Sequence, residues 1–201
     1  MKILGLTGPS GAGKTLFSFF LCAKGCPCIN ADELYHSMLI PPSKLLDAIR
    51  REFGDSFFNE NGELDRKALG RLVFSSKESL DKLNATVLPA VIEKMQDIAA
   101  SYEKNGARLL IIDAPTLFEA GYDKSCDLTV SILAPASIRI ERISERDDIS
   151  IDDAILRTSA QKDDSFYRER SDRIILNDSD ENALKEKALA LLNEILDEDA
   201  L

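Results

Sequence analysis

The first residues with a clear chemical meaning form the segment Gly8-Pro9-Ser10-Gly11-Ala12-Gly13-Lys14-Thr15. Their spacing matches the pattern G-x-x-x-x-G-K-[S/T] at every specified position. Backbone N–H groups of such a loop can surround a polyphosphate, and the helix that follows directs its positive end at the same anion. A fortuitous glycine-rich loop is the alternative, but this one lies between a short apolar run and a helical segment, as a phosphate site requires. We expect the following residues to bind a phosphorylated ligand: Gly11, Ala12, Gly13, Lys14, Thr15 and Leu16.

Two side chains of this loop, and one from a distant segment, could act on the phosphates directly. Lys14 supplies a positive charge to the β- and γ-phosphates, and Thr15 offers a hydroxyl ligand to Mg²⁺. Asp113 ends the apolar run Leu109–Asp113, and a carboxylate beside Thr15 could hold a metal-bound water. The alternative is that Asp113 caps the short segment after it. We expect Thr15 and Asp113 to form the metal site.

A second carboxylate, Asp32, follows the apolar run 28–31. The carboxyl end of a parallel strand is where ligands collect in open sheets, so Asp32 is expected to face the terminal phosphate. Phosphoryl transfer to a hydroxyl needs a group that orients the hydroxyl and accepts its proton late. Asp32 could instead be the N-cap of a helix over 33–38, and Glu33 is a second candidate for the base. The two roles of Asp32 are compatible, and we expect it to act as the base or hydroxyl-orienting group.

Basic side chains gather in one stretch, since seven of the twelve arginines lie between positions 139 and 173. Arg139, Arg142 and Arg146 follow at i, i+3 and i+7 and share one helix face. Glu141 and Glu145 lie among them, so a solvated, salt-bridged helix is the alternative. Beside a phosphate loop we expect a closing lid, which would bring guanidinium groups onto the transferring phosphoryl group and exclude water.

The elements that must position these residues are short apolar runs alternating with helical segments. Five runs predict strands: Lys2–Thr7, 28–31, Leu109–Asp113, Leu128–Leu133 and Arg173–Leu176. Helices are expected over 14–23, 32–38, 43–53, 65–74, Lys77–Lys104, Ala136–Asp147, 151–163 and 183–196. This alternation indicates an α/β fold with a five-stranded parallel sheet covered by helices on both faces. The stretch 43–105 shows no convincing strand, so part of it is expected to form an inserted helical lobe.

The overall composition limits the classes of partner. The chain has 25 Lys and Arg against 35 Asp and Glu, a formal net charge of −10, which disfavours nucleic acid and anionic membranes as partners. No apolar run reaches the length of about eighteen residues that a transmembrane helix needs, and the N-terminus does not read as a secretory signal. The four cysteines lack metal-site spacing and are expected to be reduced thiols in the cytoplasm. His36 is the only histidine, which excludes histidine-based triads and most zinc sites.

Several longer segments resemble dephospho-CoA kinases, and the resemblance runs over nearly the whole chain. They are ILGLTGPSGAGKT, INADELYH, FGDSFFNENGELDRKALGRLVF, LDKLNATVLPAVIE, LLIIDAPTLFEAGYDKSCD, the R-x-x-x-R-D of Arg142–Asp147, Gln161 and SDRIILND. The phrase NGELDRKALGRLVF is the most specific part, because unrelated P-loop kinases do not carry it.

The resemblance implies a single P-loop kinase unit over 1–201. The nucleotide-binding core would comprise 1–38, 106–138 and 166–201, with a helical acceptor-binding lobe over 39–105 and a helical lid over 139–165. The implied reaction is the last step of coenzyme A biosynthesis, in which ATP with Mg²⁺ phosphorylates the ribose 3′-hydroxyl of dephospho-CoA. Asp32, Lys14 and Arg142 would be the catalytic residues, Arg146 would bind ATP, and Asn177 would lie near the adenine. A monomer or weak oligomer is expected.

The chain departs from the family pattern at several positions. Leu88 stands where a histidine is usual, Thr116 where a leucine is usual, and Arg139 where a lid glutamine is usual, while Tyr167 replaces a lysine or arginine that is displaced to Arg168. None of these is in the phosphate loop, so acceptor affinity is affected more than chemistry. The alternatives are a nucleotide or nucleoside kinase of the same fold, or an ATP-binding relative with impaired catalysis. A GTPase is not expected, because no N-K-x-D segment occurs.

Overall fold

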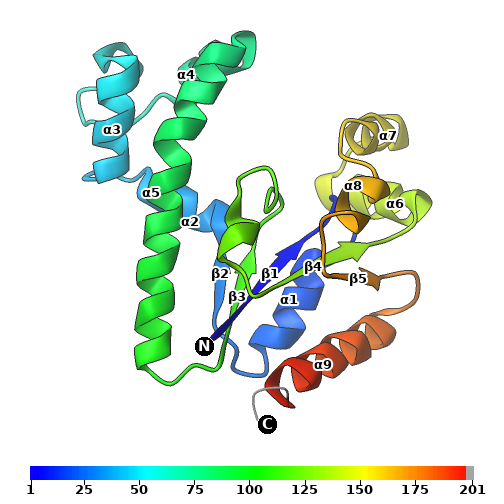
Figure 1. Cartoon of the computed structure of the whole chain (residues 1–201). Helices are drawn as coiled ribbons and strands as arrows, with labels where there is room; N and C mark the ends of the chain where they lie inside the picture. Colours follow the sequence, from blue (N-terminus) through cyan, green and yellow to red (C-terminus); the bar gives the residue numbers. More distant parts are fainter. Residues whose placement is uncertain (198–201) are drawn as a thin grey trace. The chain divides into compact units, whose positions relative to one another are not determined.

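The chain forms a five-stranded parallel sheet with helices packed on it (Figure 1). The computed structural model describes residues 1–197. The strands are β1 Lys2–Thr7, β2 Cys28–Asn30, β3 Leu109–Asp113, β4 Leu128–Leu133 and β5 Arg173–Leu176. Their order in the sheet is β2-β3-β1-β4-β5, and β1 pairs in parallel with both β3 and β4. The glycine loop after β1 therefore emerges at the centre of the sheet, between the carboxyl ends of β3 and β4.

One face of this sheet is covered by two helices, α1 Lys14–Cys22 and α9 Glu181–Asp197. Leu4 and Leu6 of β1 alternate toward this face and are buried against apolar residues of both helices. Such burial stabilises a fold by about 1.5–3 kcal/mol for each large aliphatic side chain. The phosphate loop is thus anchored at both ends, by a buried strand before it and a buried helix after it.

The other face of β1 is packed against the connection between β3 and β4, which includes the short helix η2 Tyr122–Ser125. A Cβ atom at Gly5 would lie 2.8 Å from Cys126 Sγ and 3.0 Å from Leu117 Cδ2. A side chain at this position would therefore push the connection off the sheet. The segment between β3 and β4 carries pocket residues, so this close packing also helps to position the site.

Two helices follow β4 and a third short one precedes β5. They are α6 Ala136–Asp147, α7 Ile151–Ser159 and α8 Asp164–Arg168. The helix expected over 151–163 is present as α7 but ends at Ser159, and α8 was not predicted from the sequence. Ala160 is the C-cap of α7, and the Asp163 side chain accepts a hydrogen bond from Phe166 N at 3.0 Å, which starts α8 as a separate helix.

The chain divides into two compact units, one formed by residues 1–29 and 102–201 and the other by residues 30–101. The second unit holds α2 Ala31–Met38, α3 Lys44–Phe53, η1 Asp55–Phe57, α4 Arg66–Ser75 and most of α5 Lys77–Lys104. Helix α2, which the sequence placed with the core, groups with this helical unit. The assignment of an acceptor-binding role to 39–105 and a lid role to 139–165 stays a prediction.

Local capping explains where the helices of the second unit begin. The Ser43 hydroxyl accepts from Leu45 N and Leu46 N, and the Asp65 carboxylate accepts from Lys67 N and Ala68 N. Each cap satisfies backbone donors that have no partner within the helix. These caps and a small set of buried aliphatic side chains hold the unit together: Leu45, Leu46, Ile49, Leu69, Val73, Val87 and Val91.

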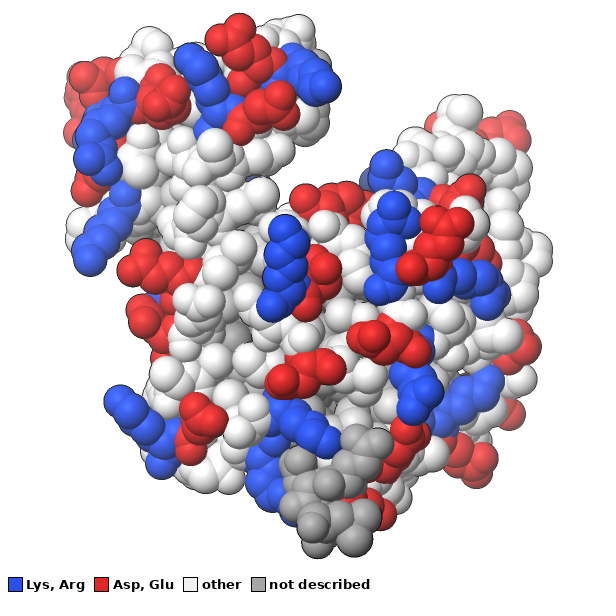
Figure 2. All heavy atoms as spheres, in the orientation of Figure 1, with Lys and Arg blue, Asp and Glu red and all other residues white. Residues whose placement is uncertain are grey.

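Acidic and basic side chains are interspersed over the face of the molecule drawn in Figure 2, so neither sign forms a continuous patch on this face. None of the helices within residues 1–197 combines the length and the apolar character that crossing a membrane requires.

Candidate active site

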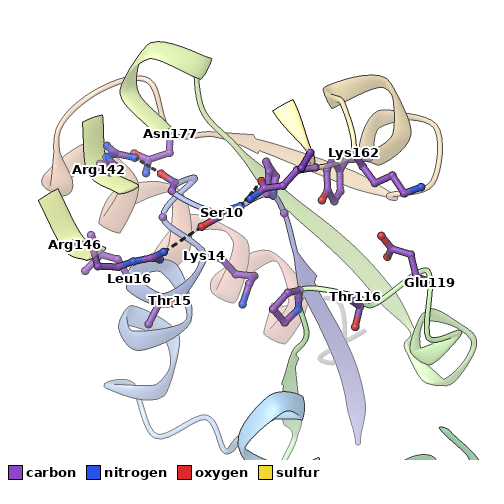
Figure 3. Close-up of a pocket in the computed structure, with 18 of the residues that line it drawn as sticks. Ser10, Lys14, Thr15, Leu16, Thr116, Glu119, Arg142, Arg146, Lys162 and Asn177 are labelled. Atoms are coloured by element: carbon purple, nitrogen blue, oxygen red, sulfur yellow. Dashed lines mark hydrogen bonds between the residues drawn. The ribbon is translucent and has the colours of Figure 1, made fainter. Parts of the chain in front are cut away.

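A pocket of about 880 Å³ opens at the carboxyl ends of the central strands, within the first unit. Its volume is in the range of small-molecule sites. The phosphate loop, the segment after β3, the arginines of α6, the start of α8 and the end of β5 all contribute to its wall. Among the lining residues are Ser10, Lys14, Thr15, Thr116, Glu119, Arg142, Arg146, Gln161, Lys162, Tyr167, Asn177 and Glu181. Figure 3 shows Lys14 between Arg142 and Asn177 on one side and Glu119 and Lys162 on the other.

The backbone of the phosphate loop requires glycine at three positions, Gly8, Gly11 and Gly13, because each has a positive φ and no room for a Cβ atom. Gly11 has φ +77°, and a Cβ atom there would lie 2.7 Å from Arg139 O. Gly13 has φ +96°, and a Cβ atom there would collide with Asn177 Nδ2. No side chain caps the N-terminus of α1 among the described residues. The first amides of α1 therefore have no side-chain cap and could bind an anion, and the binding of a phosphate there stays a prediction.

Lys14 and Asp113 meet at the base of the loop, where the Lys14 ammonium pairs with Asp113 Oδ1. The pair is largely buried, since the side chains are 12% and 4% exposed. Parallel pairing of β1 with β3 sets Leu6 opposite Asp113 and brings the carboxylate to the loop. The alternative role of Asp113 as a cap finds no support, because its oxygen accepts from Lys14 and the next amide, Ala114 N, donates to Leu6 O.

Several half-buried cysteines of the first unit have raised pKa values, among them Cys28 and Cys126. Burial raises the pKa of the Cys28 thiol, and Cys22, with its charge and its hydrogen bond, and Asp113 add to the rise, while Lys14 opposes it. Burial also raises the pKa of Cys126 to about 12, with smaller contributions from Asp123 and Asp127. Both thiols are therefore protonated at neutral pH. All four cysteines of the chain are free.

The arginines of α6 lie on the phosphate loop. Arg142 Nη1 donates to Gly11 O at 3.3 Å, and Arg146 Nη2 donates to Ser10 Oγ at 3.2 Å. Arg146 also donates to Asp147 at 2.8 and 2.9 Å, and these hydrogen bonds lower the pKa of Asp147. These contacts with the loop rule out the alternative considered from the sequence, in which the arginines of α6 only face solvent. Arg139, the third member of the row, is buried at 7% exposure.

Two amide side chains, Gln161 and Asn177, hold the loop from other segments. Gln161 Oε1 accepts from Ser10 N at 2.9 Å, and Asn177 Nδ2 donates to Ala12 O at 2.8 Å. Both contacts join positions more than 150 residues apart in the chain. Sequence reasoning did not predict either contact, although it singled out Gln161 by resemblance and expected Asn177 near the adenine. Asn177 lines the pocket, and its position near an adenine stays a prediction.

Asp32 belongs to the second unit, where it is the second residue of α2 and is exposed. Its expected alternative role as an N-cap is wrong. Asn30 is the cap, because its Oδ1 accepts from Asp32 N at 3.0 Å and from Glu33 N at 3.1 Å. Strand β2 correspondingly ends at Asn30, one residue earlier than expected. With the cap filled by Asn30, the Asp32 carboxylate is available for another role, and its action on a hydroxyl stays a prediction.

Thr15 and Asp113, the residues expected to hold a metal, carry the kind of oxygen donors that Mg²⁺ prefers. The Thr15 hydroxyl is exposed at the pocket, and the Asp113 carboxylate lies beside the loop, so both are hard oxygen donors. Within residues 1–197 no three His, Cys, Asp or Glu side chains gather into a metal site. Mg²⁺ at a phosphate site keeps waters and takes phosphate oxygens, so it needs only one or two protein ligands. Thr15 and Asp113 fit that requirement.

Comparison with known proteins gives consistent matches along nearly the full chain. A family model described as dephospho-CoA kinase matches residues 2–183. The dephospho-CoA kinase of Staphylococcus haemolyticus is 35% identical over 193 residues, which are 96% of this chain and 95% of that protein. A solved structure named TT1252, from Thermus thermophilus, has a TM-score of 0.79 at 30% identity, covering 96% and 97% of the two chains. The dephospho-CoA kinase of Campylobacter jejuni has a TM-score of 0.71 at 25% identity, covering 97% and 98%.

Proposed function

The chain belongs to the dephospho-CoA kinase family and phosphorylates dephospho-CoA with ATP in coenzyme A biosynthesis, and we propose that Lys14, Arg142 and Asp32 carry out the transfer. The observation that supports the phosphate end is a convergence within one pocket. Lys14, the guanidinium of Arg142 and the uncapped amides of α1 all lie at the same loop. A polyphosphate is the ligand that such a set of donors and positive charges favours.

The reaction forms a bond between the γ-phosphorus of ATP and the ribose 3′-oxygen of dephospho-CoA. It breaks the bond between that phosphorus and the oxygen bridging to the β-phosphate, and ADP leaves. Lys14 moves its ammonium from Asp113 to the β- and γ-phosphate oxygens when ATP enters the pocket. Because the amides of the loop are already in place, the protein reorganises little as charge shifts toward the leaving oxygen.

Thr15 and Asp113 are proposed to hold Mg²⁺ at this position. A bound Mg²⁺ would supply positive charge that favours transfer of the γ-phosphoryl group. Thr15 contributes its hydroxyl from the first turn of α1, and Asp113 contributes its carboxylate from the end of β3. The exchange of Lys14 from Asp113 to the phosphates leaves that carboxylate free for a metal-bound water.

The helices α6 and α7 are proposed to act as the lid. Arg142 and Arg146 rest on carbonyl and hydroxyl oxygens of the loop, so a bound phosphate would offer them stronger, charged acceptors a short distance away. Gln161 holds Ser10 N from the segment between α7 and α8 and ties that segment to the loop. A lid closed in this way excludes water, which keeps the phosphoryl group for the alcohol.

Asp32 is proposed to orient the 3′-hydroxyl and to accept its proton late in the transfer. Support comes from its exposed carboxylate at the carboxyl end of β2, freed from capping by Asn30. Glu33, its neighbour, is exposed as well and provides a matched control. The helical segment 39–105 is proposed to receive the rest of dephospho-CoA.

A coupled assay of ADP release tests these assignments. Wild-type protein with ATP and Mg²⁺ is expected to release ADP rapidly only when dephospho-CoA is added. Asp32→Ala is expected to bind ATP normally and to lose about 10²–10⁴-fold in kcat, whereas Glu33→Ala retains transfer. Normal transfer by Asp32→Ala would remove that residue from the mechanism. Turnover with a nucleoside monophosphate in place of dephospho-CoA would overturn the choice of acceptor.

The protein is further proposed to act in the cytoplasm as a monomer or weak oligomer. The four free cysteines support a reducing compartment, where thiols persist without forming disulfides. Neither a nucleic acid nor a membrane is proposed as a partner, since the net charge of −10 repels polyanions. Sedimentation of the purified protein across a concentration series measures the oligomeric state directly.

A further inference from the structure

Arg139, whose backbone lies beside the phosphate loop, has side-chain hydrogen-bond donors that lack an acceptor. Arg139 on α6 is 7% exposed, and its Nε and Nη1 atoms are buried with no hydrogen-bond partner. Tyr167 on α8 is 4% exposed and lines the pocket, where its hydroxyl can act as a donor. Buried donors are normally paired, and an unpaired buried charge is especially costly. Arg139 therefore has buried donors for which residues 1–197 supply no acceptor.

Arg139 packs against Gly11 of the phosphate loop, and its charge acts on Tyr167, which lines the pocket. A Cβ atom on Gly11 would lie 3.1 Å from Arg139 Cβ, so Arg139 packs directly against the phosphate loop. Burial raises the pKa of Tyr167 to about 12, Glu119 adds to this rise, and the positive charge of Arg139 opposes it. The Tyr167 hydroxyl is therefore protonated at neutral pH and is available as a donor.

The missing partner must accept hydrogen bonds and carry negative charge. A neutral carbonyl would pair with the donors but would leave the guanidinium charge without compensation. The carboxylates of Glu119 and Asp164 affect the pKa of Tyr167, yet neither accepts a hydrogen bond from Arg139. A phosphoryl group accepts hydrogen bonds through its oxygens and carries high negative charge, so it can pair with the donors and compensate the guanidinium charge.

We propose that Arg139 and Tyr167 form a phosphoryl-binding subsite at the wall of the pocket, completed when a phosphate group of a substrate enters. This inference rests on the proposed function, since the phosphate comes from that reaction. Two sources share the chemistry, namely the terminal phosphate of ATP and a phosphate of dephospho-CoA. In either case the cost of the unpaired guanidinium in the free protein is relieved on binding, so the residue favours the liganded state.

The test compares Arg139→Met with Tyr167→Phe and with the control Arg173→Met. Arg173 is exposed on β5 and pairs with Glu194 at the surface. Without ligand, Arg139→Met is expected to unfold at the same temperature as wild type or higher, because the unpaired buried charge is gone. Its dissociation constant for the relevant substrate is expected to rise about tenfold to a hundredfold, with partial recovery in Arg139→Lys. Tyr167→Phe is expected to show a smaller rise, and Arg173→Met none.

Calorimetric titration identifies the phosphate. Weaker ATP binding with unchanged ADP binding assigns the subsite to the terminal phosphate, whereas weaker binding of dephospho-CoA alone assigns it to the acceptor. Wild-type affinity of both Arg139→Met and Tyr167→Phe for ATP and for dephospho-CoA would overturn the proposal, as would a large loss of ligand-free stability in Arg139→Met with no loss of affinity. Because binding needs no turnover, failure of the wild type to phosphorylate dephospho-CoA would refute the proposed function separately.

Discussion

Exchange of Asp113 for asparagine tests the ion pair at the base of the phosphate loop. The substitution keeps the shape of the side chain and removes its negative charge, which leaves the Lys14 ammonium, 12% exposed, without its partner. Breaking a buried pair from one side costs about 3–5 kcal/mol. For a chain of 201 residues each kcal/mol shifts Tm by about 2–4 °C, so Asp113→Asn is expected to lower Tm by about 6–20 °C.

The matched variants are Lys14→Met and the double variant Lys14→Met/Asp113→Asn. Lys14→Met alone leaves the carboxylate unpaired and is expected to cost a similar amount. The double variant carries no buried charge at this position, so it should recover most of the lost stability. Unfolding followed by circular dichroism, without nucleotide and with EDTA, measures all four proteins. If the two single effects simply add in the double variant, the side chains are not paired in solution and the reasoning fails.

Stability and activity should separate in the double variant. Its Tm is expected to approach that of the wild type, whereas ATP-dependent phosphorylation stays lost because the charge of Lys14 is gone. Recovery of transfer along with stability would show that Lys14 serves only the fold.

Three further predictions follow from single positions. Gly13→Ala places a Cβ atom against the Asn177 amide, so it should weaken ATP binding more than tenfold, as measured by calorimetry. The control is Gly25→Ala, at φ +87° with open space around it, which should lower the free energy of unfolding by only about 1 kcal/mol. Hydrogen bonds from Thr129 lower the pKa of Asp172, so that carboxylate stabilises the fold above pH 4 and the contribution is lost as the pH falls further. Asp172→Asn should accordingly lower Tm at pH 6 and differ less from wild type at pH 3. Cys126, with its pKa near 12, should resist a thiol reagent at pH 7.5 in the native protein and react once urea unfolds it, and fast native labelling would contradict its burial.

The structure gives the surroundings of the residues that depart from the family pattern. Arg139 and Tyr167 are 28 positions apart in sequence, yet the charge of Arg139 acts on Tyr167. Leu88 lies on α5 in the second unit, and nothing in the structure explains its presence there. Thr116 lines the pocket next to Pro115 and adds a hydroxyl to the wall.

The sequence by itself determined the phosphate loop, the five strands and the family, because these depend on contiguous residues. A glycine loop between an apolar run and a helix specifies its own backbone conformation, and runs of buried aliphatic residues predict strands wherever both faces of a sheet are covered. The pairing of Lys14 with Asp113 could also be anticipated, since the carboxyl ends of parallel strands meet at one edge.

Only the tertiary structure decided which side chains hold that loop and which remain without partners. Asn177 meets Ala12 and Gln161 meets Ser10 through packing of elements more than 150 positions apart, and no local pattern encodes such contacts. Asn30, and not Asp32, is the N-cap of α2. Strand β2 ends at Asn30, one residue earlier than its apolar pattern suggested, and the helix begins directly after it. Arg139 shares a helix face with two arginines that reach the loop, yet it is buried and packs against Gly11, which helical periodicity alone does not reveal.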